Sequence, residues 1–266
     1  MRLVFLVGLE GSGHHYLHSA IRKMFQDNRI ERLNECHLTS AYYLTTSMTK
    51  SPLTYAGAHA RANREMGILE LQGRRVSRPG SIALLTSGSC RRIGQLSYPN
   101  YGGEEKVQQY IDVRMLAEVA EARGVDLRLI YLKRPAKDMV IANTEHRSFV
   151  TAVGDTPITA WDEAYMKYMR VLFTDIAAMH SGLAELGPGF VICHDFAEIG
   201  NAEQASRIAE FIAPNTVIAN MTLTALQGTI KPHREQEESP YVGAADVVIQ
   251  RLQGKLDVLE SVFCPK

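Results

Sequence analysis

Short apolar runs alternate with amphipathic stretches along this chain. The apolar runs have the continuous character of strands that are buried on both faces, as parallel strands are. They cover residues 2–7, 82–86, 127–132 and 190–193. In the other stretches apolar residues recur at helical spacing. These cover residues 14–25, 56–64, 104–123, 135–149, 159–186, 201–212 and 244–262. Strands that alternate with helices predict a three-layer α/β fold, with a mostly parallel sheet flanked by helices.

Turn residues and breaks in periodicity define the domain organisation. Gly124 follows a predicted helix as a C-cap, and the run Gly187–Gly189 ends another. Residues 27–80 are rich in Ser, Thr, Arg, Gly and Tyr, and most of them lack a clear period. Since no repeat, low-complexity tract or linker interrupts the chain, we predict one domain over residues 1–266. Residues 27–80 would form an irregular insertion or a cap on the substrate side.

Composition excludes several classes of protein. The chain has 266 residues, of which 45% are hydrophobic and 22% charged, as in folded globular proteins. Its 29 basic and 29 acidic residues balance, which argues against a coat for nucleic acid or for an anionic membrane. No run reaches the roughly 18 apolar residues of a membrane span. The apolar N-terminal run leads into a glycine turn rather than a cleavage site, so we interpret it as a strand.

The cysteine content bears on the compartment. There are four cysteines, Cys36, Cys90, Cys193 and Cys264, too few for a disulfide scaffold. They fit a reducing compartment, or one or two bridges at most. We therefore expect a cytoplasmic protein.

A glycine-rich segment, Gly8 to His15, lies between the first strand and the first helix. Glycines let backbone N–H groups converge on an anion, and the helix N-terminus adds partial positive charge. The spacing is that of a nucleotide phosphate loop, but His14 and His15 stand where a nucleoside triphosphatase has Lys and then Ser or Thr. This argues against ATP or GTP hydrolysis and against a metal-dependent kinase. The alternative is a tight turn that binds no ligand.

Two cations, Lys133 and Arg134, follow the third predicted strand. In a doubly wound sheet the carboxyl ends of the strands form the ligand edge. An arginine there can bind a phosphate with two hydrogen bonds. The alternative is a solvated helix start in which both cations pair with Asp138.

These residues resemble the sulfotransferase superfamily, whose sulfuryl donor is 3′-phosphoadenosine 5′-phosphosulfate (PAPS). Residues 8–15 resemble the 5′-phosphosulfate loop, and residues 131–138 resemble the segment that holds the 3′-phosphate. Residues 191–196 look like a strand and turn of that family, and residues 203–212 resemble the helix after it. The resemblance implies the P-loop NTPase-like architecture of sulfotransferases. Residues 27–127 match weakly or not at all.

The resemblance also implies roles for individual residues. Ser12, Gly13 and His14 stand where the family holds the 5′-phosphate, Tyr16 where an aromatic ring contacts adenine, and Arg134 on the 3′-phosphate arginine. A late basic loop, residues 228–234, resembles the one that closes over the 3′-phosphate. The cofactor-binding set implied in this way is Glu10, Gly11, Ser12, Gly13, His14, His15, Tyr16, Arg134, Asn143, Lys231 and Arg234.

The chain departs from the family at three places. Gly11 replaces a lysine or arginine that helps neutralise the sulfuryl group, and His14 and His15 replace hydroxyl residues. One of the two histidines would then supply the missing positive charge. Ala142 replaces the serine that follows the phosphate-binding arginine, and Asn143 or Thr144 would take over its contact.

Sulfuryl transfer also needs a base for the proton of the acceptor. Residues 34–37, Asn-Glu-Cys-His, resemble a stretch of carbohydrate sulfotransferases in which the glutamate is the base. Glu35 is therefore the first candidate, and its alternative role is a surface pair with Arg32. His14 and His15 are the next candidates, because an imidazole can act as a base or as a cation.

The expected function is transfer of a sulfuryl group from PAPS to a hydroxyl of a carbohydrate or small molecule. No metal is expected, since Cys36/His37 and Cys193/His194 are adjacent pairs that lack the spacing of a zinc site. No nucleic-acid partner is expected either. The alternatives are a P-loop nucleotide kinase or hydrolase with a degenerate loop, and a nucleotide-binding protein without activity. The acceptor and the oligomeric state are left open.

Overall fold

The computed structural model describes a part of the chain that holds a central sheet, its covering helices and a short antiparallel strand pair. They are residues 1–8, 17, 20, 21, 23, 55–76, 82–86, 100–102, 107–109, 112–138, 179–198, 201–214 and 242–264.

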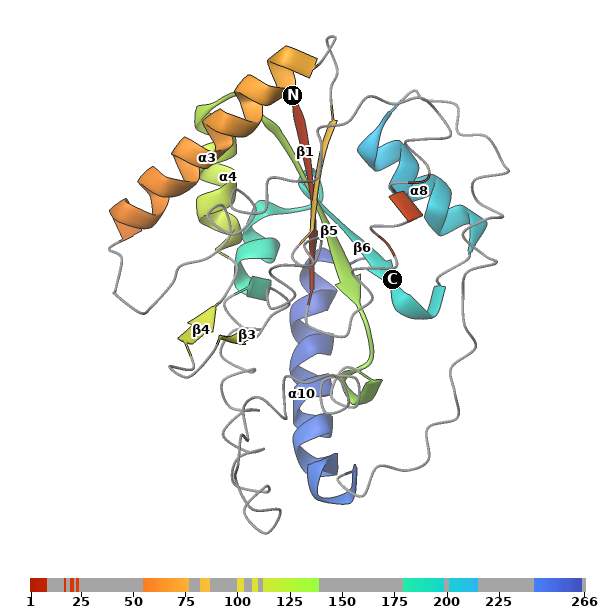
Figure 1. Cartoon of the computed structure of the whole chain (residues 1–266). Helices are drawn as coiled ribbons and strands as arrows, with labels where there is room; N and C mark the ends of the chain where they lie inside the picture. The colour runs from red at the N-terminus through yellow and green to blue at the C-terminus, as the bar shows by residue number, and fades with distance from the viewer. Residues whose placement is uncertain are drawn as a thin grey trace.

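Four parallel strands form the central sheet (Figure 1). They are β1 (Arg2–Val7), β2 (Ile82–Thr86), β5 (Asp126–Lys133) and β6 (Val191–Asp195), in the spatial order β2-β1-β5-β6. In register, Val7 pairs with Tyr131 and Lys133 pairs with Asp195. The apolar runs in the sequence therefore predicted the strands correctly, and the α/β class with a parallel sheet is confirmed.

Side chains of the strands alternate between two buried layers. Leu3, Phe5 and Val7 face one layer, while Val4 and Leu6 face the other. All five are completely buried, which is why β1 appears in the sequence as an uninterrupted apolar run.

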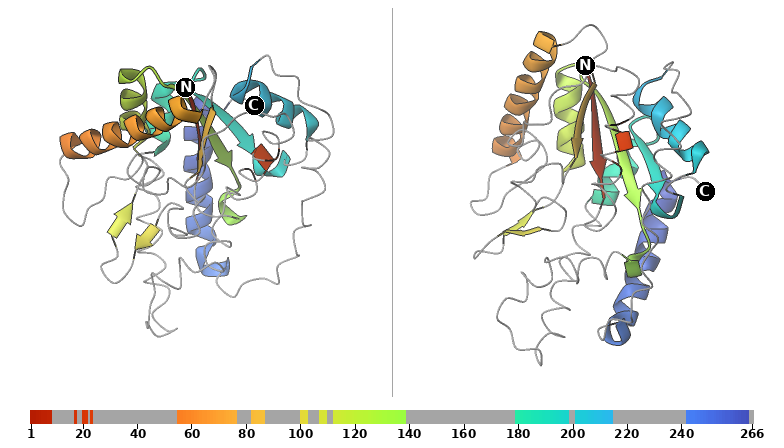
Figure 2. Two further views of the ribbon diagram at one scale, coloured as in Figure 1. Left: turned by 45° about the horizontal axis from the view of Figure 1, so that its top comes forward. Right: turned by 45° about the vertical axis from the view of Figure 1, so that its right-hand side comes forward.

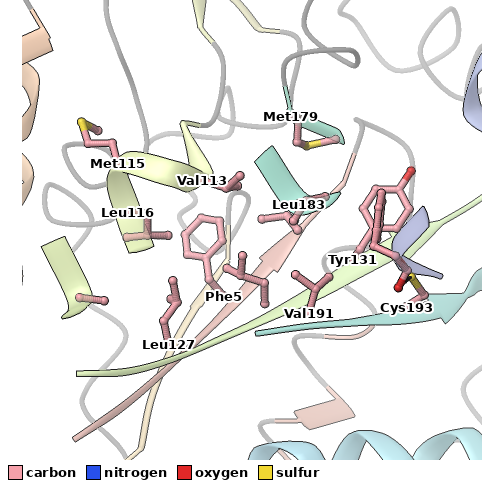
Figure 3. Packing of buried hydrophobic residues seen from close by; sticks show 14 of the residues in the cluster. Phe5, Val113, Met115, Leu116, Leu127, Tyr131, Met179, Leu183, Val191 and Cys193 are labelled. Atoms are coloured by element: carbon pink, nitrogen blue, oxygen red, sulfur yellow. Dashed lines mark hydrogen bonds between the residues drawn. The ribbon is translucent and has the colours of Figure 1, made fainter. Parts of the chain in front are cut away.

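The first layer consists of α3 (Tyr55–Val76), α4 (Val113–Ala122), the helical segment 179–186 and α10 (Val242–Phe263). Figure 3 shows Phe5 and Val191 pointing from the strands toward Leu116 and Leu183 on the helices.

The second layer contains α8 (Ala202–Ile212), which covers the opposite face of the sheet (Figure 2). Leu17 and Ile21, which are helical as predicted for residues 14–25, pack in the same layer as Val4 and Leu6. Helices therefore flank both faces of the sheet.

The helix predicted over residues 104–123 begins later, so that part of the prediction is wrong. An antiparallel pair, β3 (Asn100–Gly102) and β4 (Val107–Gln109), precedes it. The Asp112 side chain then accepts a hydrogen bond of 3.0 Å from the N–H of Met115 and starts α4 at Val113. An aspartate at this position satisfies an N–H that has no partner within the helix. Conversely, α3 extends well beyond the helix predicted for residues 56–64.

Glycines end two of the helices where the sequence predicted it. Gly124 has φ of 62° and Gly187 has φ of 72°, in the left-handed region that glycine adopts at low cost. After α4, the N–H of Val125 bonds the carbonyl of Ala120 and the N–H of Gly124 bonds that of Glu121. These two bonds form a Schellman motif, which satisfies the last carbonyls of the helix.

A disulfide joins β6 to the end of α10. Cys193 and Cys264 are bonded, with 5.4 Å between their Cα atoms and a sequence separation of 71. Both cysteines are buried in the first layer. The bridge fastens the C-terminal end of α10 to the carboxyl half of β6. In the described part of the chain, no helix combines the length and apolar character that a membrane crossing requires.

Candidate functional site

The carboxyl ends of β1 and β5 lie side by side. Val7, the last residue of β1, pairs with Tyr131 near the end of β5, and Gly8 follows as a buried residue. The strand order reverses at this point, since β2 lies on one side of β1 and the later strands lie on the other. Ligands of open parallel sheets bind at such a reversal, outside the carboxyl ends of the strands. We therefore take this edge as the candidate site.

Of the site residues predicted from the sequence, Arg134 is the one that the structure describes. The others lie outside the described residues. They are Glu10, Gly11, Ser12, Gly13, His14, His15, Tyr16, Glu35, Asn143, Lys231 and Arg234.

Arg134 follows β5 directly and lies half-buried at the candidate edge. Its guanidinium carbon lies 4.4 Å from the ring centroid of Phe196, in the short 3₁₀ turn η2 (Phe196–Glu198) that follows β6. Burial lowers the pKa of Arg134 from its usual value, while the nearby carboxylate of Asp138 opposes that shift. A cation held over a ring can still offer the N–H groups of its guanidinium to an anion.

Lys133 lies on the opposite side of β5 and pairs with carboxylates from two other elements. Its ammonium nitrogen is 3.9 Å from Asp195 at the end of β6 and 3.9 Å from Glu260 on α10. The sequence had suggested Asp138 as an alternative partner for both cations. For Lys133 the ion pairs are instead with residues far away in sequence, which bring β5, β6 and α10 together at this edge.

A buried hydrogen-bond network lies directly beneath Lys133. The hydroxyl of Tyr131 donates to the Glu260 carboxylate at 2.6 Å, and Nε2 of His180 lies 2.8 Å from the same hydroxyl. Because the hydroxyl has one proton and gives it to the carboxylate, it must accept from His180, which places a proton on Nε2. Each of these three side chains is at most 4% exposed.

The burial of this network shifts its acid–base properties. Loss of solvent raises the pKa of Glu260, while the hydrogen bond from Tyr131 and the charge of Lys133 oppose that rise. Loss of solvent also raises the pKa of Tyr131 well above 10.0, and the Glu260 carboxylate adds to the rise. The network therefore holds a buried carboxyl that accepts a hydrogen bond from Tyr131 and pairs with the charge of Lys133.

Sequence reasoning missed this network, although one signal was present. Glu260 falls on the apolar stripe of α10, between Leu256 and Phe263, where a helix normally carries hydrophobic residues. A carboxylate at such a position indicates a buried partner. Nothing in the sequence identifies that partner as Tyr131, 129 residues away.

His194 on β6 is a second buried titratable group near this edge. It is 4% exposed, and within the described part of the chain its Nδ1 has no hydrogen-bond partner. Loss of solvent lowers its pKa from 6.5 to about 4; Asp195 opposes the shift and Arg207 on α8 adds to it. The ring is therefore neutral near pH 7.

We expect His194 to make the fold sensitive to acid. The unfolded chain takes up a proton at His194 below pH 6.5, whereas the folded chain does so only near pH 4. The stability that the neutral ring contributes is thus present above pH 6.5 and lost as the pH falls to 4. The loss should reach about 3 kcal/mol in the free energy of unfolding.

Urea unfolding at a series of pH values measures this loss, with His194→Gln compared against the wild type. The variant should have a flatter dependence of stability on pH between 6.5 and 4. The same substitution at the half-buried His59 of α3 controls for the loss of an imidazole. Equal pH slopes in the His194 variant and the wild type would contradict the prediction.

Neither metal ligands nor known relatives assign a function to this edge. The described side chains include no group of three or more His, Cys, Asp or Glu residues that could hold a metal ion. No family model and no curated protein matches the sequence. Function must therefore be inferred from the residues and their geometry.

Proposed function

We propose that this protein is a sulfotransferase that moves a sulfuryl group from PAPS to a hydroxyl of a carbohydrate or small-molecule acceptor. One observation carries the proposal. The Gly8–His15 segment and the Lys133–Arg134 turn start from adjacent carboxyl ends of β1 and β5. Two anion-binding segments at one sheet edge suit a nucleotide with phosphates at both its 5′ and 3′ positions. The P-loop NTPase-like sulfotransferase architecture is part of this proposal.

Each segment has a role in the proposed reaction. Backbone N–H groups of the Gly8–His15 segment would bind the 5′-phosphosulfate, and Arg134 would bind the 3′-phosphate. Arg134 fits such a group because it is a half-buried cation oriented by Phe196. PAPS supplies an activated sulfuryl group whose sulfur–oxygen bond to phosphate breaks as the acceptor oxygen bonds to sulfur.

The remaining requirement is a base. Glu35 would accept the proton of the acceptor hydroxyl, with His14 or His15 as the alternative. In either case 3′,5′-adenosine bisphosphate (PAP) leaves with the electron pair of the broken bond. No metal takes part in this scheme.

Thermal unfolding in the presence of PAP, compared with ATP plus Mg²⁺, tests the proposed function. A ligand that binds the folded state raises the melting temperature by mass action. A shift with PAP alone supports the sulfotransferase. A shift with ATP and Mg²⁺ alone supports the nucleotide kinase or hydrolase, and no shift with PAP at millimolar concentration overturns the proposal.

Arg134→Ala should weaken PAP binding by about 2 kcal/mol or more, roughly 30-fold in Kd, the scale for truncating one partner of a charged contact. Adenosine 5′-phosphosulfate lacks the 3′-phosphate, so its affinity should change little. Arg114→Ala is the matched control, because Arg114 is an exposed arginine of α4 that pairs with Glu185. Equal loss for both nucleotides would remove Arg134 from the 3′-phosphate site.

The cytoplasmic location belongs to the proposal as well. The Cys193–Cys264 bridge weighs against it, since disulfides persist mainly in oxidising compartments. Alkylation of thiols during cell lysis, followed by mass analysis, distinguishes a cytoplasmic location from an oxidising compartment. Free thiols at both positions favour the cytoplasm, and a bridged pair favours an oxidising compartment.

A further inference from the structure

We propose that Gln253 on α10 is a positioning residue for Arg134, a role that rests on the proposed function. The side chain of Gln253 would hold the turn after β5 in the place from which Arg134 reaches the 3′-phosphate. This role is supported by the way in which the helix beginning at Ala136 is capped.

The N–H groups of the first helical turn have no partners within their own helix. Residues 136–138 are helical, and the N–H of Ala136 lies in that first turn. A Ser, Thr, Asp or Asn just before the helix normally accepts such a bond. Here the preceding residues are Lys133, Arg134 and Pro135, whose side chains contain no acceptor. This turn therefore has no local cap.

Gln253 supplies the missing acceptor from 117 residues away. The N–H of Ala136 donates to its Oε1 at 2.8 Å. Its Nε2 in turn donates to Oδ1 of Asp257, one helical turn further on, at 2.7 Å. Because a carboxylate only accepts hydrogen bonds, the contact with Asp257 fixes which end of the amide faces Ala136.

The helix that carries Gln253 is itself fastened to the same edge of the sheet. Glu260 of α10 accepts from Tyr131 of β5, and Cys264 is bonded to Cys193 of β6. Positions 253, 260 and 264 are seven and four residues apart and so lie on one side of the helix. Figure 1 shows α10 running beside the carboxyl end of β5. Gln253 is thus presented from a helix that two other contacts hold against the sheet.

The turn is held from both sides. Gln253 contacts its backbone from the α10 side, whereas the Arg134 guanidinium rests on Phe196. Ala136 is completely buried, so a side chain of similar volume without an acceptor at position 253 would leave its N–H unpaired. An unpaired buried N–H is costly, and a shift of the turn that regains a partner would move Arg134 as well.

Gln253→Met tests the role, because methionine fills a similar volume and offers no comparable acceptor. Gln253→Glu keeps an oxygen acceptor and serves as the conservative rescue. Gln250→Met on the exposed side of α10 is the matched control. Asp257→Ala removes the contact that orients the amide from an exposed position, which makes it a second variant that should fold in any case.

The first measurement is hydrogen exchange of residues 134–138 in the protein without ligand. Exchange of the Ala136 amide should be about fivefold to tenfold faster in Gln253→Met, the scale of one neutral hydrogen bond. Asp257→Ala and Gln253→Glu keep an acceptor for Ala136 but lose the contact between positions 253 and 257, so both should show a smaller increase. Gln250→Met should match the wild type. Unchanged exchange in both Gln253→Met and Asp257→Ala would overturn the capping role.

The second measurement compares the affinities for PAP and 5′-AMP, which lacks the 3′-phosphate. Gln253→Met should weaken PAP binding about tenfold and leave 5′-AMP binding unchanged, because only Arg134 is displaced. Suppose that Gln253→Met speeds exchange of the Ala136 amide but leaves the ratio of the affinities for PAP and 5′-AMP unchanged. Gln253 would then cap the helix without positioning Arg134, and the proposal would be overturned. If the wild type binds no PAP, the proposed function itself fails, and positioning fails with it, whereas the exchange result still reports on the cap.

Discussion

Replacing Cys193 and Cys264 together with alanine should lower the free energy of unfolding by about 4 kcal/mol. The bridge closes a loop with a sequence separation of 71. Closing a loop of this length restricts the unfolded chain, so removal of the bridge stabilises the unfolded state. Alanine is chosen because both sulfurs lie among apolar side chains, where burying the hydroxyl of a serine would add a cost of its own.

Urea unfolding with and without a thiol reductant measures this effect. The reductant should lower the midpoint for the wild type to near that of the double variant, and it should leave the double variant unchanged. Replacing Cys36 and Cys90 with alanine controls for the loss of two thiols. A midpoint that does not respond to reductant in the wild type would contradict the expected contribution of the bridge.

Tyr131→Phe should lower the free energy of unfolding by roughly 3–5 kcal/mol near pH 8, although it removes a single oxygen. The hydroxyl is the 2.6 Å donor to the buried Glu260 carboxylate and the acceptor from His180. Phenylalanine leaves that carboxylate with Lys133 at 3.9 Å and His180 Nε2 at 4.0 Å as its remaining contacts among those described here. Leaving a buried charge without its hydrogen-bond donor costs more free energy than the hydrogen bond contributed to stability.

The loss of unfolding free energy caused by Tyr131→Phe should be smaller at low pH. Loss of the donor raises the pKa of Glu260 further above its ordinary 4.5, which burial already raises. The variant is therefore penalised most where the unfolded carboxyl is ionised. Below the pKa that Glu260 has in the unfolded chain, its carboxyl is neutral in both the folded and the unfolded state. The loss of unfolding free energy should then fall to about 1 kcal/mol. His180, Lys133, Asp195 and Asp257 also face this carboxyl, so the comparison is made with the wild type at each pH.

A double variant separates the hydrogen bond from simple loss of packing. Tyr131→Phe combined with Glu260→Met removes the unpaired carboxylate and should be more stable near pH 8 than Tyr131→Phe alone. Urea unfolding of the four proteins of this cycle gives the coupling between the two side chains. A double variant that is less stable than Tyr131→Phe would show that the unpaired Glu260 carboxylate is not what destabilises Tyr131→Phe.

The pattern of residues along short segments was sufficient to predict many of the strands and helix ends. Residues 3–7 of β1 and 129–132 of β5 are buried on both faces of the sheet, so they had to be apolar without alternation. Gly124 and Gly187 end helices because glycine adopts positive φ at low cost. Asn201 starts α8 because its side chain accepts the N–H of Glu203. Each of these effects acts within a few residues.

The sequence pattern gave a wrong prediction where a segment could form either a helix or a strand. Residues 104–112 carry helix-forming side chains that join the periodic stretch after them. The start of α4 was decided by the Asp112 cap, and β4 was decided by pairing with β3. Strand pairing depends on a partner segment, which periodicity along one segment does not contain.

By itself, the sequence determined the α/β class, the four strands of the central sheet and the position of Arg134 at the end of β5. Only the tertiary structure decided what holds that position. Of four cysteines it paired Cys193 with Cys264, and it gave Ala136 a cap from Gln253. These contacts join residues far apart in the chain, and their strength comes from burial, which a residue acquires only when the sheet and both helical layers have assembled.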